Sequence, residues 1–190
     1  MRALINMNAG HDRCMYCEYS EAGTVDHFCP RARDPNQTFH WRNLILACGR
    51  CQAAKGDRFN KELLNPARHG YTPSDHFELE SDTGEFVLLS AESKSTNQII
   101  RWERDILVRS RRATLQSYQA AIIAYAEAIN VRNTASSQKA VQWARDLPHP
   151  TVFDWIIHWC LQGPPAQGPD PLDPRVRSAV AAHPGIRTWL

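Results

Sequence analysis

The sequence lacks both a long hydrophobic run and a strong excess of charge of one sign. None of its apolar stretches approaches the ~20 residues that a membrane-spanning helix needs, so we expect no membrane partner. The opening residues, MRALINMN, turn polar too early for a secretion signal, and we therefore expect a cytoplasmic protein. With 22 basic and 20 acidic side chains, the net charge of +2 does not by itself point to nucleic acid.

Charge is nevertheless unevenly distributed along the 190 residues. Residues 61–100 are acidic and residues 101–150 are basic, with a cluster of arginines at Arg109, Arg111 and Arg112. Two interpretations of this cluster stay open: a solvated helix face, or a surface that faces phosphate groups. Hydrophobic residues make up 43% and charged residues 22%, which is typical of a globular protein and excludes a disordered or fibrous one.

Four of the six cysteines form two Cys-x-x-Cys pairs, Cys14/Cys17 and Cys48/Cys51. Disulfides are the weaker interpretation in a chain with no secretion signal, and a thioredoxin-like redox pair would not need two matched copies. Two thiolate pairs suit one tetrahedral structural zinc ion, which we predict here. The unmatched Cys29 and Cys160 are expected to be small buried hydrophobic residues rather than ligands.

The hydrophobic pattern predicts an α+β fold with four parts. Strands over 24–28 and 44–47, a loop over 30–38 and a helix starting at 48 give residues 1–60 a treble-clef, ββα-metal arrangement around the zinc. Residues 61–94 form a loop and a β-hairpin around Asp82-Thr83-Gly84. Helical spacing over 95–129, across two helices, and again over 151–161 predicts a mainly helical region at 95–162. Residues 163–190 are expected to be a proline-rich linker and a tail.

The first 60 residues also carry a set of short motifs in a characteristic order: Cys14-x-x-Cys17, Asp26-His27-Phe28-x-Pro30, Trp41-x-Asn43-Leu44 and Cys48-x-x-Cys51-Gln52-x-x-Lys55-Gly56-Asp57. Together they resemble an HNH (His-metal finger) endonuclease with a four-cysteine zinc site. Short blocks that follow are similar to the PtuB-type HNH nucleases of Septu and retron anti-phage systems: Leu63-Leu64-Asn65-Pro66, Asp75-His76-Phe77-Glu78 and Thr83-Gly84. Residues 130–190 resemble no family that we can name.

The resemblance implies roles for particular residues. His27 would be the general base that takes a proton from water, because histidine titrates near neutral pH. Asp26 and Gln52 would hold a catalytic Mg or Mn ion through hard oxygens, and Asn43 would hold the loop that orients His27. Adjacent strand residues point to opposite faces, so a local twist must bring Asp26 and His27 into one site.

Gln52 is a departure from the family pattern, which usually has Asn or His at this position. Glutamine keeps the amide oxygen but adds a methylene group, which puts metal affinity and activity in question. We expect its side-chain oxygen to turn toward Asp26. Near the helix start, Arg50 and Lys55 are candidate phosphate contacts, although a solvated lysine would fit equally well.

These features lead to one functional expectation and one alternative. The expectation is a metal-dependent HNH endonuclease that hydrolyses DNA, leaving 5′-phosphate and 3′-hydroxyl ends as the resemblance implies. By the narrower resemblance, it would be the effector of an anti-phage system with an ABC-type ATPase (PtuA-like) partner. The alternative is a non-catalytic zinc-finger module that binds nucleic acid or protein and has a decayed HNH site.

Overall fold

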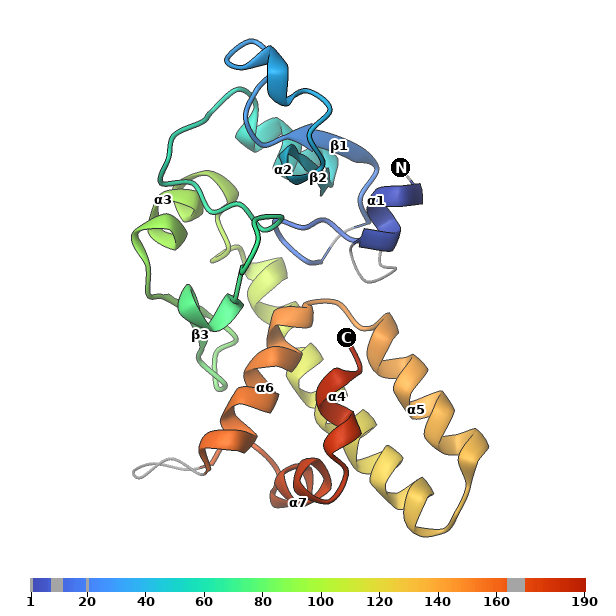
Figure 1. The fold of residues 1–190 in the computed structure, drawn as a ribbon. Coiled ribbons are helices and arrows are strands. Elements are labelled where there is room, and N and C mark those ends of the chain that lie inside the picture. Colours follow the sequence, from blue (N-terminus) through green and yellow to red (C-terminus); the bar gives the residue numbers. More distant parts are fainter. Residues whose placement is uncertain (1, 8–11, 20, 164–169) are drawn as a thin grey trace. The chain divides into compact units, whose positions relative to one another are not determined.

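A computed structural model describes residues 2–7, 12–19, 21–163 and 170–190 (Figure 1). They form two compact units, each described by itself below. The first unit comprises Met1–Glu78 and Glu85–Leu107, and the second comprises Leu79–Gly84 and Val108–Leu190. In chain order the elements are α1 (Arg2–Met7), β1 (Thr24–His27), β2 (Leu44–Ala47), α2 (Gly49–Lys55), β3 (Phe77–Leu79), β4 (Phe86–Leu88), α3 (Ala91–Ile100), α4 (Asp105–Asn130), α5 (Thr134–Asp146), α6 (Pro150–Gln162) and α7 (Pro174–Ala182).

The first unit is built around the pair β1–β2 with α2 beside it (Figure 1). The strands pair antiparallel, and the register sets Asp26 opposite Ile45 and His27 opposite Leu44. Two short 3₁₀ helices, Pro35–Gln37 and Trp41–Asn43, lie in the connection between the strands. The predicted order of strand, loop, strand and helix, and the α+β fold class, are confirmed.

A hairpin and a capped helix complete this unit. Strands β3 and β4 pair around the predicted turn, which confirms the hairpin. Helix α3 begins at a capping box, in which Ser90 and Ser93 satisfy each other's backbone N–H groups. The Trp102 indole donates a 2.7 Å hydrogen bond to the Tyr16 carbonyl, and its ring meets Phe77 edge to face. The chain segment after α3 is thereby attached to the cysteine region at the start of the chain.

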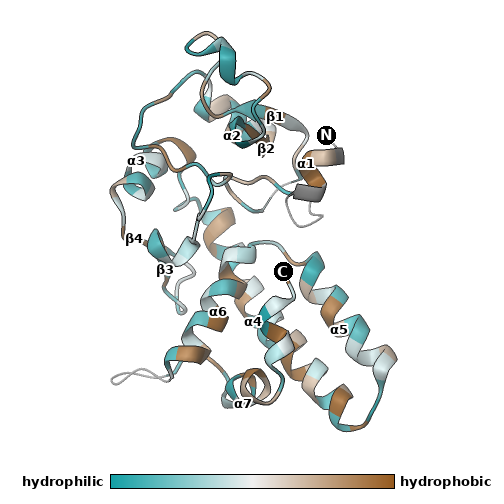
Figure 2. Cartoon of the chain, viewed as in Figure 1, coloured by the Kyte–Doolittle hydropathy of each residue, from teal (hydrophilic) through white to brown (hydrophobic). Residues whose placement is uncertain are grey.

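The second unit is helical, as predicted. Apolar and polar residues are interspersed along α4, α5 and α6 (Figure 2), which is the pattern of helices with one buried face. From α4, Leu115, Tyr118 and Ile122 are buried at spacings of three and four residues. The Tyr118 ring packs on Phe153 of α6.

Helices α5 and α7 form where the sequence pattern does not single out a helix. In α5 the buried residues are Ser137, Ala140 and Ala144, and such small side chains give little hydrophobic periodicity. Helix α7 begins at Pro174, the last proline of the predicted linker, because proline is favourable in the first turn of a helix. Residues 164–169 of that linker lie outside the described residues.

Within the described part of the chain, we find no helix with both the length and the apolar character needed to cross a membrane.

Candidate active site and metal centre

The two Cys-x-x-Cys pairs come together in the first unit. Cys14, Cys17, Cys48 and Cys51 are all buried, and their sulfur atoms lie within 4.8 Å of one another. Cys48 is the N-cap of α2 and Cys51 lies in its first turn, so the helix start presents the second pair to the first. Four sulfurs at this spacing are the donor set of a structural zinc site.

Proton sharing within the cluster also favours a cation. Hydrogen bonds with Cys17, Cys48 and Cys51, together with burial, raise the pKa of the Cys14 thiol. The hydrogen bond with Cys14 lowers the pKa of Cys48 to about 6, although burial acts in the opposite direction. Because packed thiols cannot all ionise without a counter-charge, the four cysteines could hold a divalent ion in exchange for their protons.

His27 ends β1, and its ring is half-buried. Its Nε2 lies 3.0 Å from the Thr38 carbonyl oxygen. A carbonyl oxygen only accepts, so Nε2 carries the proton and donates it. In the neutral ring the lone pair therefore resides on Nδ1, and no described residue forms a hydrogen bond to that atom. The ring is held as a base with one acceptor nitrogen available.

Asn43 holds the backbone around His27 from both sides. It is 3% exposed, and its Oδ1 accepts from the Cys29 N–H at 2.6 Å. Its Nδ2 donates to the Cys29 carbonyl and, at 3.0 Å, to the Gln37 carbonyl. Gln37 directly precedes Thr38, the acceptor for the His27 ring. These contacts agree with the expected loop-holding role of Asn43, whose effect on catalysis stays a prediction.

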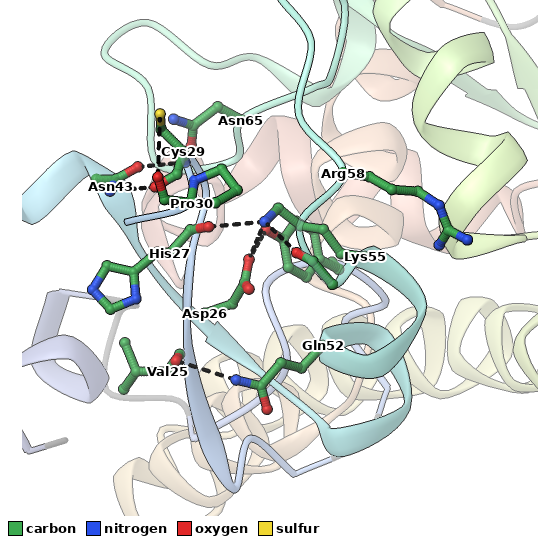
Figure 3. Close-up of polar contacts among 12 residues, drawn as sticks. Val25, Asp26, His27, Cys29, Pro30, Asn43, Gln52, Lys55, Arg58 and Asn65 are labelled. Atoms are coloured by element: carbon green, nitrogen blue, oxygen red, sulfur yellow. Dashed lines mark hydrogen bonds and ion pairs between the residues drawn. The ribbon is translucent and has the colours of Figure 1, made fainter. Parts of the chain in front are cut away.

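Asp26 lies on the other side of β1 from the His27 ring (Figure 3). Its Oδ2 accepts a 2.7 Å hydrogen bond from the Tyr16 hydroxyl and forms a 2.9 Å ion pair with Lys55 Nζ. The local twist expected to unite Asp26 and His27 is absent, because β1 pairs regularly with β2 along its length. Burial, and then the Asp26 charge, raise the pKa of Tyr16 well above its usual value, so its hydroxyl stays a donor.

Lys55 fits neither of its two expected roles, a phosphate contact or a solvated side chain. It is 2% exposed, so it is neither solvated nor available to phosphate. Besides the Asp26 ion pair, its Nζ donates to the His27 carbonyl at 2.8 Å (Figure 3). Lys55 thus joins α2 to β1 at both candidate residues. Arg50 is exposed on α2, and its contact with substrate stays a prediction.

Gln52 lies on α2 directly after Cys51, as expected. Its side chain, however, presents nitrogen to the strand: Nε2 donates to the Val25 carbonyl at 3.4 Å (Figure 3). Among the described residues, none donates to Gln52 Oε1 or Asp26 Oδ1. Carboxylate and amide oxygens are the donors that Mg and Mn prefer, so each atom is a suitable donor for a hard cation. That the two share one ion stays a prediction.

The arginine cluster does not form one surface. Arg109 and Arg112 are exposed, but Arg111 is completely buried, and its Nε donates to the Gly84 carbonyl at 2.8 Å. Residues one and two apart on a helix point in different directions, so three such arginines cannot share a face. The phosphate-facing interpretation is therefore wrong for Arg111, and it stays a prediction for Arg109 and Arg112.

Two residues near the site carry no sequence signal of their own. Tyr16 reads as a spacer within the first cysteine pair, and Thr38 as a loop residue. Only the folded chain shows that Tyr16 binds Asp26 and that Thr38 orients His27.

Comparisons with known proteins agree with this geometry. The family model described as HNH endonuclease matches residues 14–58, which confirms the resemblance to that family. A segment of the chain is also 36% identical over 84 residues to Septu protein PtuB of Bacillus thuringiensis. That alignment covers 40% of this chain and 31% of the relative, so the chain spans under a third of the relative's length. No solved structure matches.

Proposed function

We propose that this protein is a metal-dependent HNH endonuclease that hydrolyses DNA phosphodiester bonds. The observation behind the proposal is the His27 ring, with Nε2 bound to a backbone carbonyl and Nδ1 left as an acceptor. The ring stands at the end of a strand in a core that the four cysteines and α2 hold together. The match of residues 14–58 to HNH endonucleases supports the same activity.

His27 would act as the base in this reaction. Nδ1 takes a proton from the attacking water, and the Thr38 carbonyl stabilises the imidazolium that forms. Asn43 keeps that carbonyl in place through Gln37. Asp26 and Gln52 would hold a Mg or Mn ion that supplies charge stabilisation at the scissile phosphate and the leaving oxygen. Because Asp26 lies on the other side of β1 from the His27 ring, this role requires a rearrangement of β1 when metal and DNA bind. Zinc at the four cysteines would be structural, because all four positions around the ion are taken.

We further propose that the nuclease serves in anti-phage defence, in the cytoplasm, together with an ABC-type ATPase partner that gates cleavage. The similarity to a relative named Septu protein PtuB supports the defence role. The ATPase is what the PtuB-type resemblance implies. Co-purification of the chain with an ATPase encoded beside it would test the partnership.

A non-catalytic binding module is the second candidate, and one observation favours it. The carboxylate expected to hold the catalytic metal is already paired with a buried lysine, at 2.9 Å. If this pair persists when DNA and metal are present, Asp26 offers a weaker cation site than a free carboxylate would.

Plasmid nicking with the His27→Ala variant tests the catalytic proposal. We expect cleavage in Mg or Mn to fall by roughly 10²–10⁴-fold, the usual contribution of a positioned general base. Chelator should abolish the wild-type activity. His69→Ala is the matched control, because His69 is an exposed histidine outside the site, and it should cut at the wild-type rate. Equal cutting by His27→Ala would show that His27 is not the base. No wild-type cutting with either metal would favour the second candidate.

A further inference from the structure

Three consecutive ring side chains project from the connection between β1 and β2: Phe39, His40 and Trp41. All three are exposed, Phe39 at 88% and Trp41 at 53%. Phe39 is the most exposed large hydrophobic side chain in the described part of the chain. Together with Arg42 we call these residues the aromatic loop. Exposed aromatic residues gathered in this way indicate a binding surface rather than isolated surface positions.

The backbone of the aromatic loop is held in place. The His40 N–H donates to the Gln37 carbonyl, and the Asn43 N–H donates to the His40 carbonyl at 2.8 Å. Asn65 Nδ2 donates to the Arg42 carbonyl at 3.1 Å. Bonds on both sides of Phe39 and Trp41 thus fix the loop while the rings stay in solvent. The folded backbone therefore keeps these rings exposed to solvent.

The aromatic loop also adjoins the proposed base. Thr38, which accepts the hydrogen bond from the His27 ring, directly precedes Phe39. A strand bound on the loop would therefore run next to the His27 ring.

The charge around the rings is positive. Arg31, Arg33 and Arg42 are exposed in the same connection, and Arg33 lies over the Phe59 ring. The only acidic residue of the connection is Asp34. Its carboxylate already accepts hydrogen bonds from the Asn36 N–H and the Gln37 amide. Flat apolar rings beside arginines match the two parts of a nucleic-acid strand, its bases and its phosphates.

We propose that the aromatic loop binds unstacked bases of single-stranded DNA, so that the substrate is single-stranded or locally unpaired. Phe39 and Trp41 stack on bases while Arg31, Arg33 and Arg42 contact phosphates. Ring stacking requires an open base face, and duplex DNA buries those faces against its own neighbours. Delivery of the bound strand to His27 rests on the proposed nuclease function, whereas the binding itself does not.

Binding of a labelled oligothymidylate by the full chain, measured by fluorescence anisotropy, tests the proposal. The measurement uses the His27→Ala background, so that cleavage does not consume the strand. We expect the Phe39→Ala/Trp41→Ala pair to raise Kd about 30-fold or more, since each of the two stacked bases contributes about 1–3 kcal/mol. Trp143→Ala is the matched control, because Trp143 is 43% exposed in the other unit, and its Kd should not change.

Two further comparisons separate ring stacking from plain apolar contact and from general attraction to phosphate. Phe39→Leu/Trp41→Leu keeps apolar bulk but removes the flat rings, and it should also weaken binding. A blunt duplex of the same length should bind the parent more weakly and respond little to either pair of substitutions.

Unchanged single-strand binding by the two double variants would overturn the proposal. So would equal losses on single strand and duplex, or binding retained by the leucine pair. Loss of self-association or of a protein partner, with unchanged Kd for DNA, would assign the loop to a protein interface instead. A His27→Ala variant that still cuts would refute the assignment of His27 as the base and leave the binding result intact.

Discussion

At the scale of single residues, Asp26 and His27 are neighbours with separate environments. Strand alternation directs Asp26 toward α2, where Tyr16 and Lys55 hold one carboxylate oxygen. His27 lies on the other side and is oriented by Thr38. The cysteine cluster is linked to the candidate site through Tyr16, which lies between Cys14 and Cys17. Substitution of these cysteines is thus expected to disturb the hydrogen bond between Tyr16 and Asp26 as well.

Gln52 should control the choice of catalytic metal. Its amide has one more rotatable bond than asparagine, and Mg demands more regular geometry than Mn. We expect the wild type to cleave better with Mn than with Mg, and Gln52→Asn to narrow that difference. Gln52→Ala should lower activity about 10- to 100-fold, the range seen when support for a metal site is removed.

Initial cleavage rates over a titration of each metal measure this effect. Gln98→Ala, at an exposed glutamine of α3, serves as the control and should match the wild type. If Gln52→Ala cuts normally, Gln52 is no ligand, and His40 is the next residue to test.

His76 should make the stability of the first unit pH-dependent. It is 3% exposed, and its Nε2 lies 2.8 Å from the Arg68 guanidinium, which only donates. Nε2 is therefore the acceptor, and Nδ1 donates to Ser90 Oγ at 2.7 Å. Burial, and then the Arg68 charge, lower the pKa of His76 below its usual value of 6.5.

Because the folded histidine resists protonation, the unfolded chain binds more protons below pH 6.5. The stabilisation that neutral His76 contributes is fully present above pH 6.5. It is lost as the pH falls from 6.5 toward the lowered pKa of the folded state. Urea unfolding at about pH 7.5 and about pH 5.5 should show a smaller loss for His76→Gln than for wild type. His69→Gln, at an exposed histidine, is the control and should lose as much stability between the two pH values as the wild type. If His76→Gln loses as much stability as the wild type, His76 is not the group responsible.

At the scale of elements, the hairpin turn packs on α4 through a glycine. Gly84 has φ +83°, a conformation that other residues rarely adopt. A Cβ at this position would collide with the Val108 carbonyl oxygen and come within 3.1 Å of Arg112. The Gly84 carbonyl accepts from the buried Arg111. The absence of a side chain at Gly84 thus allows the backbone of the turn to pack directly against the backbone of α4.

Gly84→Ala should therefore destabilise the second unit by about 2 kcal/mol or more, the combined effect of the strained φ and the collision. Chemical unfolding followed by the helical circular dichroism signal measures the loss. Gly185→Ala is the matched control, because nothing lies within 4 Å of a Cβ there, and it should shift stability much less. Equal stability of the two variants would show that the turn relaxes away from α4.

At the scale of the whole molecule, the chain consists of two compact units, and the cysteine cluster lies in the first. A structural metal contributes its binding free energy directly to folding. We predict one zinc per chain, and loss of hydrogen-exchange protection over residues 12–55 in Cys48→Ser or after chelation. Amides in α4 beyond Val108, and in α5 to α7, should keep their protection.

Cys160→Ser supplies the control for this experiment, since Cys160 is a half-buried cysteine outside the cluster. It should retain zinc and full protection. A zinc-free preparation that is protected throughout would disprove a structural role for the metal. Uniform loss of protection in both units would instead mean that they unfold as one.

The sequence by itself determined the features that depend on spacing along the chain. The two Cys-x-x-Cys pairs, the strands around them and the hairpin around Asp82-Thr83-Gly84 each follow from short local patterns. Such patterns work because ligand spacing, alternation and turn chemistry act over a few residues. His27 and Asn43 were expected from motifs that resemble the HNH family, and the structure places both beside the connection between β1 and β2.

Only the tertiary structure decided which side chains lose water and which partners they gain. Lys55 and Arg111 look like surface cations in the sequence, yet both are buried against segments at least 27 residues away. Phe39 is a large hydrophobic residue, yet it is 88% exposed. A side chain's environment depends on which distant segments pack against it, and short sequence patterns do not specify those tertiary contacts. Periodicity likewise missed α5 and α7, because the small residues or prolines that define them carry little hydrophobic contrast.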